Sequence, residues 1–181
     1  MKPGPIFFLT GAPGVGKSTT ANALANRFRK AIRFDVDYFR ALVISGLKQP
    51  TSGWDEETEL QFRLAHQAVG AIAKTYSDAG FAVVAEHCSS NDMVQEFLAY
   101  SEGGIVVCLK STMDTNLARN LMRTEKSFDP KDIEHFVVSM GDSLYREFEG
   151  KFTVLDTTNL TVDEAVDEIL VAPPCGVQTK Y

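Results

Sequence analysis

One short segment constrains the fold of this chain more than any other: residues 11–18, which read GAPGVGKS. The segment matches the pattern G-x-x-x-x-G-K-[ST] and directly follows an apolar, strand-like stretch at residues 6–9. Glycines let such a loop turn tightly with its backbone N–H groups facing inward, where they bind phosphate oxygens. A helix that begins where the loop ends adds the positive end of its dipole. The segment therefore predicts a phosphate-binding loop (P-loop) between a strand and a helix.

The polar residues that close this loop have separate expected roles. The ammonium group of Lys17 supplies a positive charge for the outer phosphates of a nucleotide, and the Ser18 hydroxyl can ligate Mg²⁺. Backbone amides along the segment hold the remaining phosphate oxygens. The expected nucleotide-binding residues here are Gly11, Ala12, Pro13, Gly14, Val15, Gly16, Lys17, Ser18 and Thr19.

Composition and charge describe an ordinary globular chain. Its 181 residues are 44% hydrophobic and 23% charged, with a net charge of −6. That charge disfavours nucleic acid as a partner, although a local basic groove stays open. We expect one domain over residues 1–171, a loosely ordered tail over residues 172–181, and a monomer or homodimer. No apolar run is long enough to span a bilayer, so we expect no membrane partner. There is no room for a signal peptide before the first strand, and the three cysteines lack C-x-x-C spacing. These observations predict a cytoplasmic protein.

Strand-like and helix-like segments alternate along the chain. Strands are expected at residues 6–9, 32–36, 81–85, 104–109 and 152–155, and helices at 18–29, 38–45, 56–78, 113–124, 131–148 and from a capping box at 161–164 onward. The unbroken apolar strands indicate a sheet that is buried on both faces and hence parallel. The predicted fold is a three-layer α/β/α sandwich, in which ligands bind at the carboxyl ends of the strands.

Two carboxylates close the second expected strand. If that strand continues through residue 36, alternation places Asp35 and Asp37 on the same face. We expect Asp37 to accept the proton of a hydroxyl group as a general base and Asp35 to assist the metal ion. The alternative for Asp37 is to cap the helix that begins at Tyr38.

A third carboxylate, Glu86, follows the third expected strand. A carboxylate at this position can support Mg²⁺ directly or through water, and Glu86 can alternatively hold a substrate hydroxyl. The adjacent His87 is either a substrate contact or a structural residue.

Cations later in the chain suggest a lid. Arg119 and Arg123 lie four residues apart on one face of an expected helix. We expect a lid around residues 119–130, with Arg119 binding nucleotide and Arg123 neutralising charge on the transferred group. The alternative is a solvated basic helix face.

The long segment between the second and third strands, residues 38–80, is expected to shape an acceptor pocket. Trp54, Arg63 and Arg40 are its candidate residues, and the alternative for Trp54 is a hydrophobic contact on the long helix. The turn at residues 156–159 follows the fifth strand and is a candidate contact for an adenine base.

Taken together, these residues resemble the small P-loop kinases. That group includes shikimate and gluconate kinases, chloramphenicol phosphotransferase and the kinase domain of polynucleotide 5′-kinases. The resemblance rests on residues 11–18, the strand end at 34–37, the two lid arginines and the turn at 156–159. It extends over about residues 5–171, although Glu86 to Ser90 stand where shikimate kinases carry a glycine triplet.

The resemblance implies a five-stranded parallel sheet in the order 2-3-1-4-5, with ATP and Mg²⁺ as cosubstrates. It also implies that Asp35 supports magnesium and that Asp37 meets the substrate hydroxyl. The expected activity is transfer of the γ-phosphate of ATP to a hydroxyl of a small molecule. Two alternatives are a P-loop ATPase switch that acts on a protein partner and a 5′-hydroxyl polynucleotide kinase.

Overall fold

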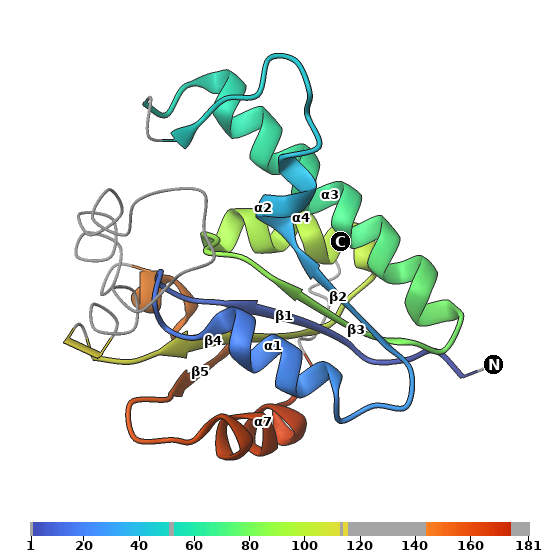
Figure 1. The fold of residues 1–181 in the computed structure, drawn as a ribbon, viewed down its shortest axis with the longest axis vertical. Coiled ribbons are helices and arrows are strands. Elements are labelled where there is room, and N and C mark those ends of the chain that lie inside the picture. The colour runs from blue at the N-terminus through green and yellow to red at the C-terminus, as the bar shows by residue number, and fades with distance from the viewer. Residues whose placement is uncertain (1, 51–52, 113, 116–143, 175–181) are drawn as a thin grey trace.

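The computed structural model describes residues 2–50, 53–112, 114–115 and 144–174. Its centre is a parallel sheet of five strands in the order β2-β3-β1-β4-β5, which confirms the predicted strand order (Figure 1). The strands are β1 (Ile6–Thr10), β2 (Ala31–Asp35), β3 (Ala82–Glu86), β4 (Ile105–Lys110) and β5 (Thr153–Asp156). Because all the strands run the same way, their carboxyl ends lie along one edge of the sheet.

Helices cover both faces of this sheet, as the α/β/α prediction requires. They are α1 (Lys17–Ala25), α2 (Val36–Arg40), α3 (Glu56–Asp78), α4 (Asn91–Ser101) and α7 (Val162–Val171). Helices α3 and α4 pack together over one face, and α1 and α7 pack together over the other (Figure 1). The N-terminal half of α3 extends beyond the sheet, beside α2 (Figure 1).

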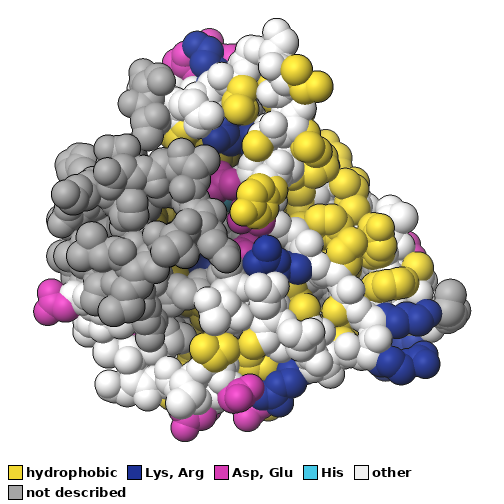
Figure 2. Space-filling model, viewed as in Figure 1, with side chains coloured by type: hydrophobic (Ala, Val, Ile, Leu, Met, Phe, Trp, Pro, Cys, Tyr) yellow, Lys and Arg dark blue, Asp and Glu magenta, His cyan; other side chains and the backbone are white. Residues whose placement is uncertain are grey.

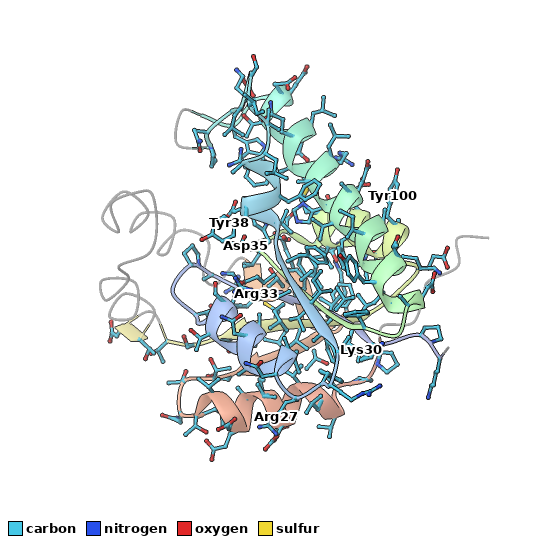
Figure 3. All side chains as sticks on the ribbon, turned by 45° about the vertical axis from the view of Figure 1, so that its right-hand side comes forward. Arg27, Lys30, Arg33, Asp35, Tyr38 and Tyr100 are labelled. Atoms are coloured by element: carbon cyan, nitrogen blue, oxygen red, sulfur yellow. The ribbon has the colours of Figure 1, made fainter. Side chains whose placement is uncertain are left out.

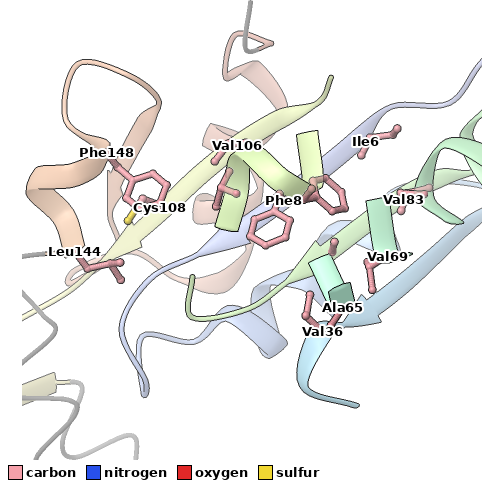
Figure 4. Packing of buried hydrophobic residues seen from close by; sticks show 14 of the residues in the cluster. Ile6, Phe8, Val36, Ala65, Val69, Val83, Val106, Cys108, Leu144 and Phe148 are labelled. Carbon is pink, nitrogen blue, oxygen red and sulfur yellow. The ribbon is translucent and has the colours of Figure 1, made fainter. Parts of the chain in front are cut away.

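The strand residues alternate between two hydrophobic clusters, one on each face. In β1, Phe8 belongs to the cluster with α3 and α4, whereas Phe7 and Leu9 belong to the cluster with α1 and α7. All three side chains are at most 2% exposed. Figure 4 shows the cluster on the α3 and α4 face, where Phe8 lies between Val106 of β4 and the α3 residues Ala65 and Val69. Burial on both faces explains why the strands read as unbroken apolar runs.

Helix α3 begins and ends where the sequence predicts, but its buried face includes residues that hydrophobicity does not reveal. Phe62, Val69 and Ala73 are buried along one face of α3 together with His66, whereas Leu60 and Leu64 are exposed. At Gly70 the helix approaches α4 so closely that a Cβ would lie 2.5 Å from the carbonyl oxygen of Phe97. A glycine is therefore required at this crossing.

The structure corrects several sequence predictions about element bounds and adds one helix. Strand β2 ends at Asp35, and α2 spans Val36–Arg40 rather than residues 38–45. The first helix ends at Ala25 instead of Arg29. Helix α4, which the sequence analysis left unassigned, is capped by the Ser90 side chain and buries an apolar face against α3.

Several predictions fall outside the described residues. These are Arg119, Arg123, the lid around residues 119–130, nearly all of the helix expected at 113–124, residues 131–143 of the helix expected at 131–148, and residues 175–181 of the tail. Of the tail, the described part begins with Ala172, which is buried against the α1 and α7 cluster. In the portion of the chain that the structure describes, no helix is both long and apolar enough to cross a bilayer.

Candidate active site

The loop at residues 11–16 joins β1 to α1 with a backbone that only glycine adopts readily. Gly11 has φ 139°, and a Cβ there would lie 2.3 Å from the carbonyl oxygen of Leu109. Gly16, with φ 101°, is the N-cap of α1. The Lys17 ammonium donates hydrogen bonds to the carbonyl oxygens of Gly11 (2.8 Å) and Ala12 (3.0 Å). These bonds hold the buried Lys17 side chain against the loop that it is expected to serve.

Glu86 joins this loop at the carboxyl end of β3. The Ser18 hydroxyl donates to Oε2 of Glu86 at 2.9 Å, and the Arg33 guanidinium donates to Oε1 at 2.9 Å. The Glu86 side chain is only 3% exposed. Burial, followed by the nearby Asp35 charge, raises the pKa of Glu86, while Lys17, Ser18 and Arg33 act in the opposite direction. The structure thus joins two of the three residues that the sequence proposed for a metal ion, Ser18 and Glu86, by a direct hydrogen bond.

Arg33 is a site residue that sequence reasoning missed. It stands within the short strand β2, between Ile32 and Phe34, and its guanidinium also lies 3.4 Å from the backbone oxygen of Ser18. Figure 3 shows Arg33 and Asp35 on β2, with Tyr38 on the helix that follows. An arginine inside an otherwise apolar strand was the available signal, because a buried charge there needs a carboxylate partner.

The two aspartates lie close together, but not for the reason that alternation suggested. Because β2 ends at Asp35, the two residues do not share a strand face. Asp35 is the N-cap of α2, and its side chain accepts a hydrogen bond from the backbone N–H of Asp37 at 2.9 Å. Asp37 lies in the first turn of α2 with its side chain 46% exposed. The capping role that the sequence offered for Asp37 therefore belongs to Asp35.

Asp37 is paired with a histidine from the next strand end. Its Oδ1 lies 3.3 Å from Nε2 of His87, a residue whose side chain is 8% exposed. His87 directly follows Glu86, so one chain segment supplies a partner to Asp37 and a partner to Ser18.

Three further candidates for the acceptor pocket have different environments. The Arg40 guanidinium lies 4.3 Å from the centroid of the Phe62 ring, and Trp54 stacks on the same ring at 5.1 Å. Burial lowers the pKa of Arg40, and the charge of Asp37 opposes this effect. Arg63 instead forms ion pairs with Glu59 and with Glu96 of α4. Arg40 and Trp54 thus gather around Phe62, whereas Arg63 holds α3 to α4.

Comparisons with known proteins give matches at the level of structure. No family model and no curated protein sequence matches the chain. A sugar kinase from Janibacter sp. HTCC2649 matches with a TM-score of 0.67 and 15% identity, over 93% of each chain. The tunicamycin resistance protein of Deinococcus radiodurans matches with a TM-score of 0.62 and 16% identity, over 96% of this chain and 99% of that one. A shikimate kinase from Acinetobacter baumannii matches with a TM-score of 0.59 and 21% identity, over 93% and 92%.

The chain has the fold of the small P-loop kinases. The resemblance drawn from its sequence is thereby confirmed. At identities of this size the likeness concerns the fold, and the chemistry has to be argued from the residues.

In this P-loop kinase fold, a cavity of about 320 Å³ opens beside the loop. Its lining includes Gly14, Gly16 and Thr19 on one side, and Thr157 and Leu160 from the β5–α7 connection on the other. Thr157 donates from its backbone N–H and its hydroxyl to the carbonyl oxygen of Lys110, at 2.7 and 3.1 Å. The turn at residues 156–159 thus reaches the cavity, while its contact with a base stays a prediction.

Charged side chains are dispersed on the face of this P-loop kinase fold that Figure 2 shows. There, Lys and Arg side chains stand in small separate groups, some of them beside Asp and Glu (Figure 2). Ion pairs such as Arg27–Asp163 and Arg27–Asp167, at 3.1 Å each, neutralise part of this charge.

Proposed function

We propose that this protein is an ATP-dependent kinase that transfers the γ-phosphoryl group of ATP to a hydroxyl group of a small molecule. The observation that carries the proposal is the convergence of three elements at one sheet edge. The P-loop brings Lys17 and Ser18, the end of β3 brings Glu86, and the start of α2 brings Asp37. A phosphate site, a metal-binding pair and a carboxylate base are the parts that phosphoryl transfer requires.

The nucleotide would bind across the loop and the adjoining cavity. Backbone amides of residues 11–18 and the Lys17 ammonium hold the β- and γ-phosphates. The nucleoside would occupy the cavity between the loop and Thr157. This cavity adjoins the phosphate-binding loop and lies beside the first turn of α1. Arg119 is proposed to bind the nucleotide and Arg123 the transferred group, both from a lid.

Mg²⁺ fits the oxygen donors of Ser18 and Glu86. Among the described residues no cluster of three or more His, Cys, Asp or Glu side chains surrounds one point. Mg²⁺ commonly binds through one or two protein oxygens together with substrate phosphates and water, so a hydroxyl and one carboxylate suffice. Asp35, whose charge acts on Glu86, is proposed to assist. When bound, the ion neutralises charge on the β- and γ-phosphates.

Asp37 would act on the acceptor. Its partly exposed carboxylate takes the proton of the acceptor hydroxyl as the acceptor oxygen forms its bond to the γ-phosphorus. The bond between the γ-phosphorus and the oxygen that bridges it to the β-phosphate breaks, and ADP leaves. Arg40, on which the charge of Asp37 acts, packs with Trp54 against Phe62, and these three residues are proposed to shape the acceptor pocket.

A two-stage experiment tests this function. Calorimetry with ATP and MgCl₂ should detect binding to the wild-type protein and weaker binding to Lys17→Ala. ADP release is then screened with sugars, nucleosides, aminoglycosides, chloramphenicol and a 5′-hydroxyl oligonucleotide as acceptors. We expect stimulation by a small hydroxyl compound. Stimulation by the oligonucleotide alone would favour a polynucleotide kinase, acceptor-independent hydrolysis would favour an ATPase switch, and no nucleotide binding would overturn all three.

A further inference from the structure

A series of close polar contacts, three hydrogen bonds and one ion-pair contact, connects Asp37 to the backbone of α3. Oδ1 of Asp37 lies 3.3 Å from Nε2 of His87, and Nδ1 of His87 lies 2.8 Å from the Ser89 hydroxyl oxygen. The same hydroxyl lies 2.7 Å from Nε2 of His66, whose Nδ1 lies 2.7 Å from the carbonyl oxygen of Phe62. Three of these side chains, from His66, His87 and Ser89, are at least nine-tenths buried.

The Phe62 carbonyl and the neutral state of His66 together set the direction of the hydrogen bonds from His66 through Ser89 to His87. A carbonyl oxygen only accepts, so Nδ1 of His66 must donate. Burial, and then the neighbouring His87, lower the pKa of His66 to about 3, so the ring is neutral and its Nε2 accepts. The single hydroxyl hydrogen of Ser89 therefore goes to His66. Ser89 must in turn accept from His87, which places a hydrogen on Nδ1 of that ring.

The far end of the chain then meets the carboxylate. With Nδ1 of His87 bonded to Ser89, Nε2 is the ring nitrogen that faces Asp37, at an ion-pair distance of 3.3 Å from its Oδ1 atom. The His87 ring is fixed by the rings of Phe62 and His66, whose centroids lie 5.4 and 5.1 Å away. His87 is thus held from behind, while its Nε2 edge is presented to Asp37.

Thr10 anchors the chain to the root of the P-loop. Its hydroxyl accepts from the backbone N–H of Ser89 and donates to the carbonyl oxygen of Ser89, both at 3.1 Å. Thr10 is the last residue of β1 and immediately precedes Gly11. The Asp37 carboxylate, which is half exposed on a helix of five residues, is therefore connected through buried groups to the loop that is expected to hold the nucleotide.

We propose that His87, oriented by Ser89 and His66, is a positioning residue that fixes the Asp37 carboxylate for the phosphoryl transfer. This inference rests on the proposed function and adds the residues on which the orientation of the base depends. A carboxylate held in one orientation before the acceptor binds avoids the entropic cost of ordering it during the reaction. The Arg40 guanidinium, on the same helix, also interacts electrostatically with Asp37.

Side-chain NMR of the full-length protein tests the chain without any acceptor or nucleotide. The sequence has three histidines, His66, His87 and His135, whose ring ¹⁵N signals are assigned with single His→Gln variants. We expect His66 to carry its hydrogen on Nδ1 and His87 to carry one on Nδ1. Asp37→Asn should shift the Nε2 signal of His87. A hydrogen on Nε2 of His66, or His87 signals that do not respond to Asp37→Asn, would overturn the inference.

Kinetics with the acceptor found by the ADP-release screen tests the positioning role. Ser89→Ala should lower kcat by about 10- to 100-fold with little change in the KM for ATP. The matched control is Ser101→Ala, another buried serine, whose hydroxyl donates to Gly103 instead. In an Asp37→Asn background, Ser89→Ala should cause less than about a twofold further loss, because both changes act through one carboxylate.

His87 itself gives the second kinetic comparison, in case Ser89→Ala does not fold. His87→Gln keeps an N–H that can donate to Asp37 and should retain more of kcat than His87→Ala. If Asp37→Asn lowers kcat but the Ser89 and His87 variants do not, the positioning role fails while the kinase function stands. If Asp37→Asn and Ser89→Ala lower kcat additively in the double variant, the positioning role likewise fails while the kinase function stands. If Asp37→Asn is fully active, the proposed base is wrong, and the NMR result alone decides whether the chain exists.

Discussion

The hydroxyl of Ser18 and the carboxylate of Glu86 lie 2.9 Å apart, although 68 residues separate them in the sequence. Because Ser18 donates its hydrogen to Glu86, the lone pairs of its oxygen can serve a cation. The parallel pairing of β1 with β3 creates this contact, since it places Glu86 opposite Leu9, just before the loop begins.

Glu86→Gln should weaken the metal site without changing the size of the side chain. The new amide is neutral, so it attracts Mg²⁺ less than the carboxylate does. Arg33 also loses the carboxylate with which it pairs. We expect the Mg²⁺ concentration for half-maximal activity, measured by titration of ADP release, to rise by about 10- to 100-fold. Glu96→Gln, which removes the partner of Arg63 on α4, is the matched control. An equal response of both variants would remove Glu86 from the metal site.

Asp37→Asn should slow turnover by about 10²–10⁴-fold, the contribution typical of a positioned general base. Nucleotide binding, measured by calorimetry, should be nearly unchanged because Asp37 lies on α2 and outside the P-loop. Asp78→Asn removes an exposed carboxylate that pairs with Lys74 and serves as the control. A loss below about threefold for Asp37→Asn would argue against the base assignment, because removal of a positioned general base lowers turnover far more than that.

Gly11→Ala should destabilise the fold as well as disturb nucleotide binding. The new Cβ would meet the Leu109 carbonyl at 2.3 Å, in a backbone conformation that disfavours side chains. Gly46 also has a positive φ, 80°, but no atom lies within 4 Å of the Cβ that Gly46→Ala adds, so this variant reports the cost of a positive φ alone, about 1 kcal/mol. Urea unfolding should show a larger loss for Gly11→Ala, by about 1 kcal/mol or more. Equal losses of unfolding free energy in Gly11→Ala and Gly46→Ala would mean that the loop moves away from β4 and relieves the contact with Leu109.

The stability of the protein should depend on pH through His66. The pKa of this buried ring falls from its ordinary 6.5 to about 3, so between these values the unfolded chain binds more protons than the folded one. The free energy of unfolding should therefore fall as the pH is lowered through this interval, by at most about 1.4 kcal/mol per pH unit from this residue. Urea unfolding of wild type and His66→Gln compares the slopes, and the variant should lack this component. Identical slopes would contradict the assignment.

Local patterns in the sequence predicted much of the architecture. The strand-loop-helix around residues 11–18, the full length of α3 and the capping box of α7 at Thr161 are all present, because each depends on neighbours within a few residues. The unbroken apolar strands also predicted a parallel sheet correctly. Strands that are buried on both faces show no alternation of polar and apolar residues, and such strands are typical of parallel sheets.

Predictions that needed a boundary or a distant partner were less successful. The pattern at residues 34–37 was interpreted as a continuous strand, but the Asp35 side chain captures the backbone N–H of Asp37 and starts α2. Helix α4 was missed for a different reason: its segment carries the Ser90 cap and an apolar face with Met93, Val94 and Phe97, but this local pattern was not interpreted as a helix.

By itself, the sequence determined the phosphate-binding loop, the class of fold and the identity of the polar residues at the strand ends. Only the tertiary structure decided which of these residues meet: Ser18 with Glu86, Glu86 with Arg33, and Asp37 with His87. The physical reason is that such contacts depend on strand order and register, which arise from packing across the whole sheet and leave no trace in the spacing of any one segment.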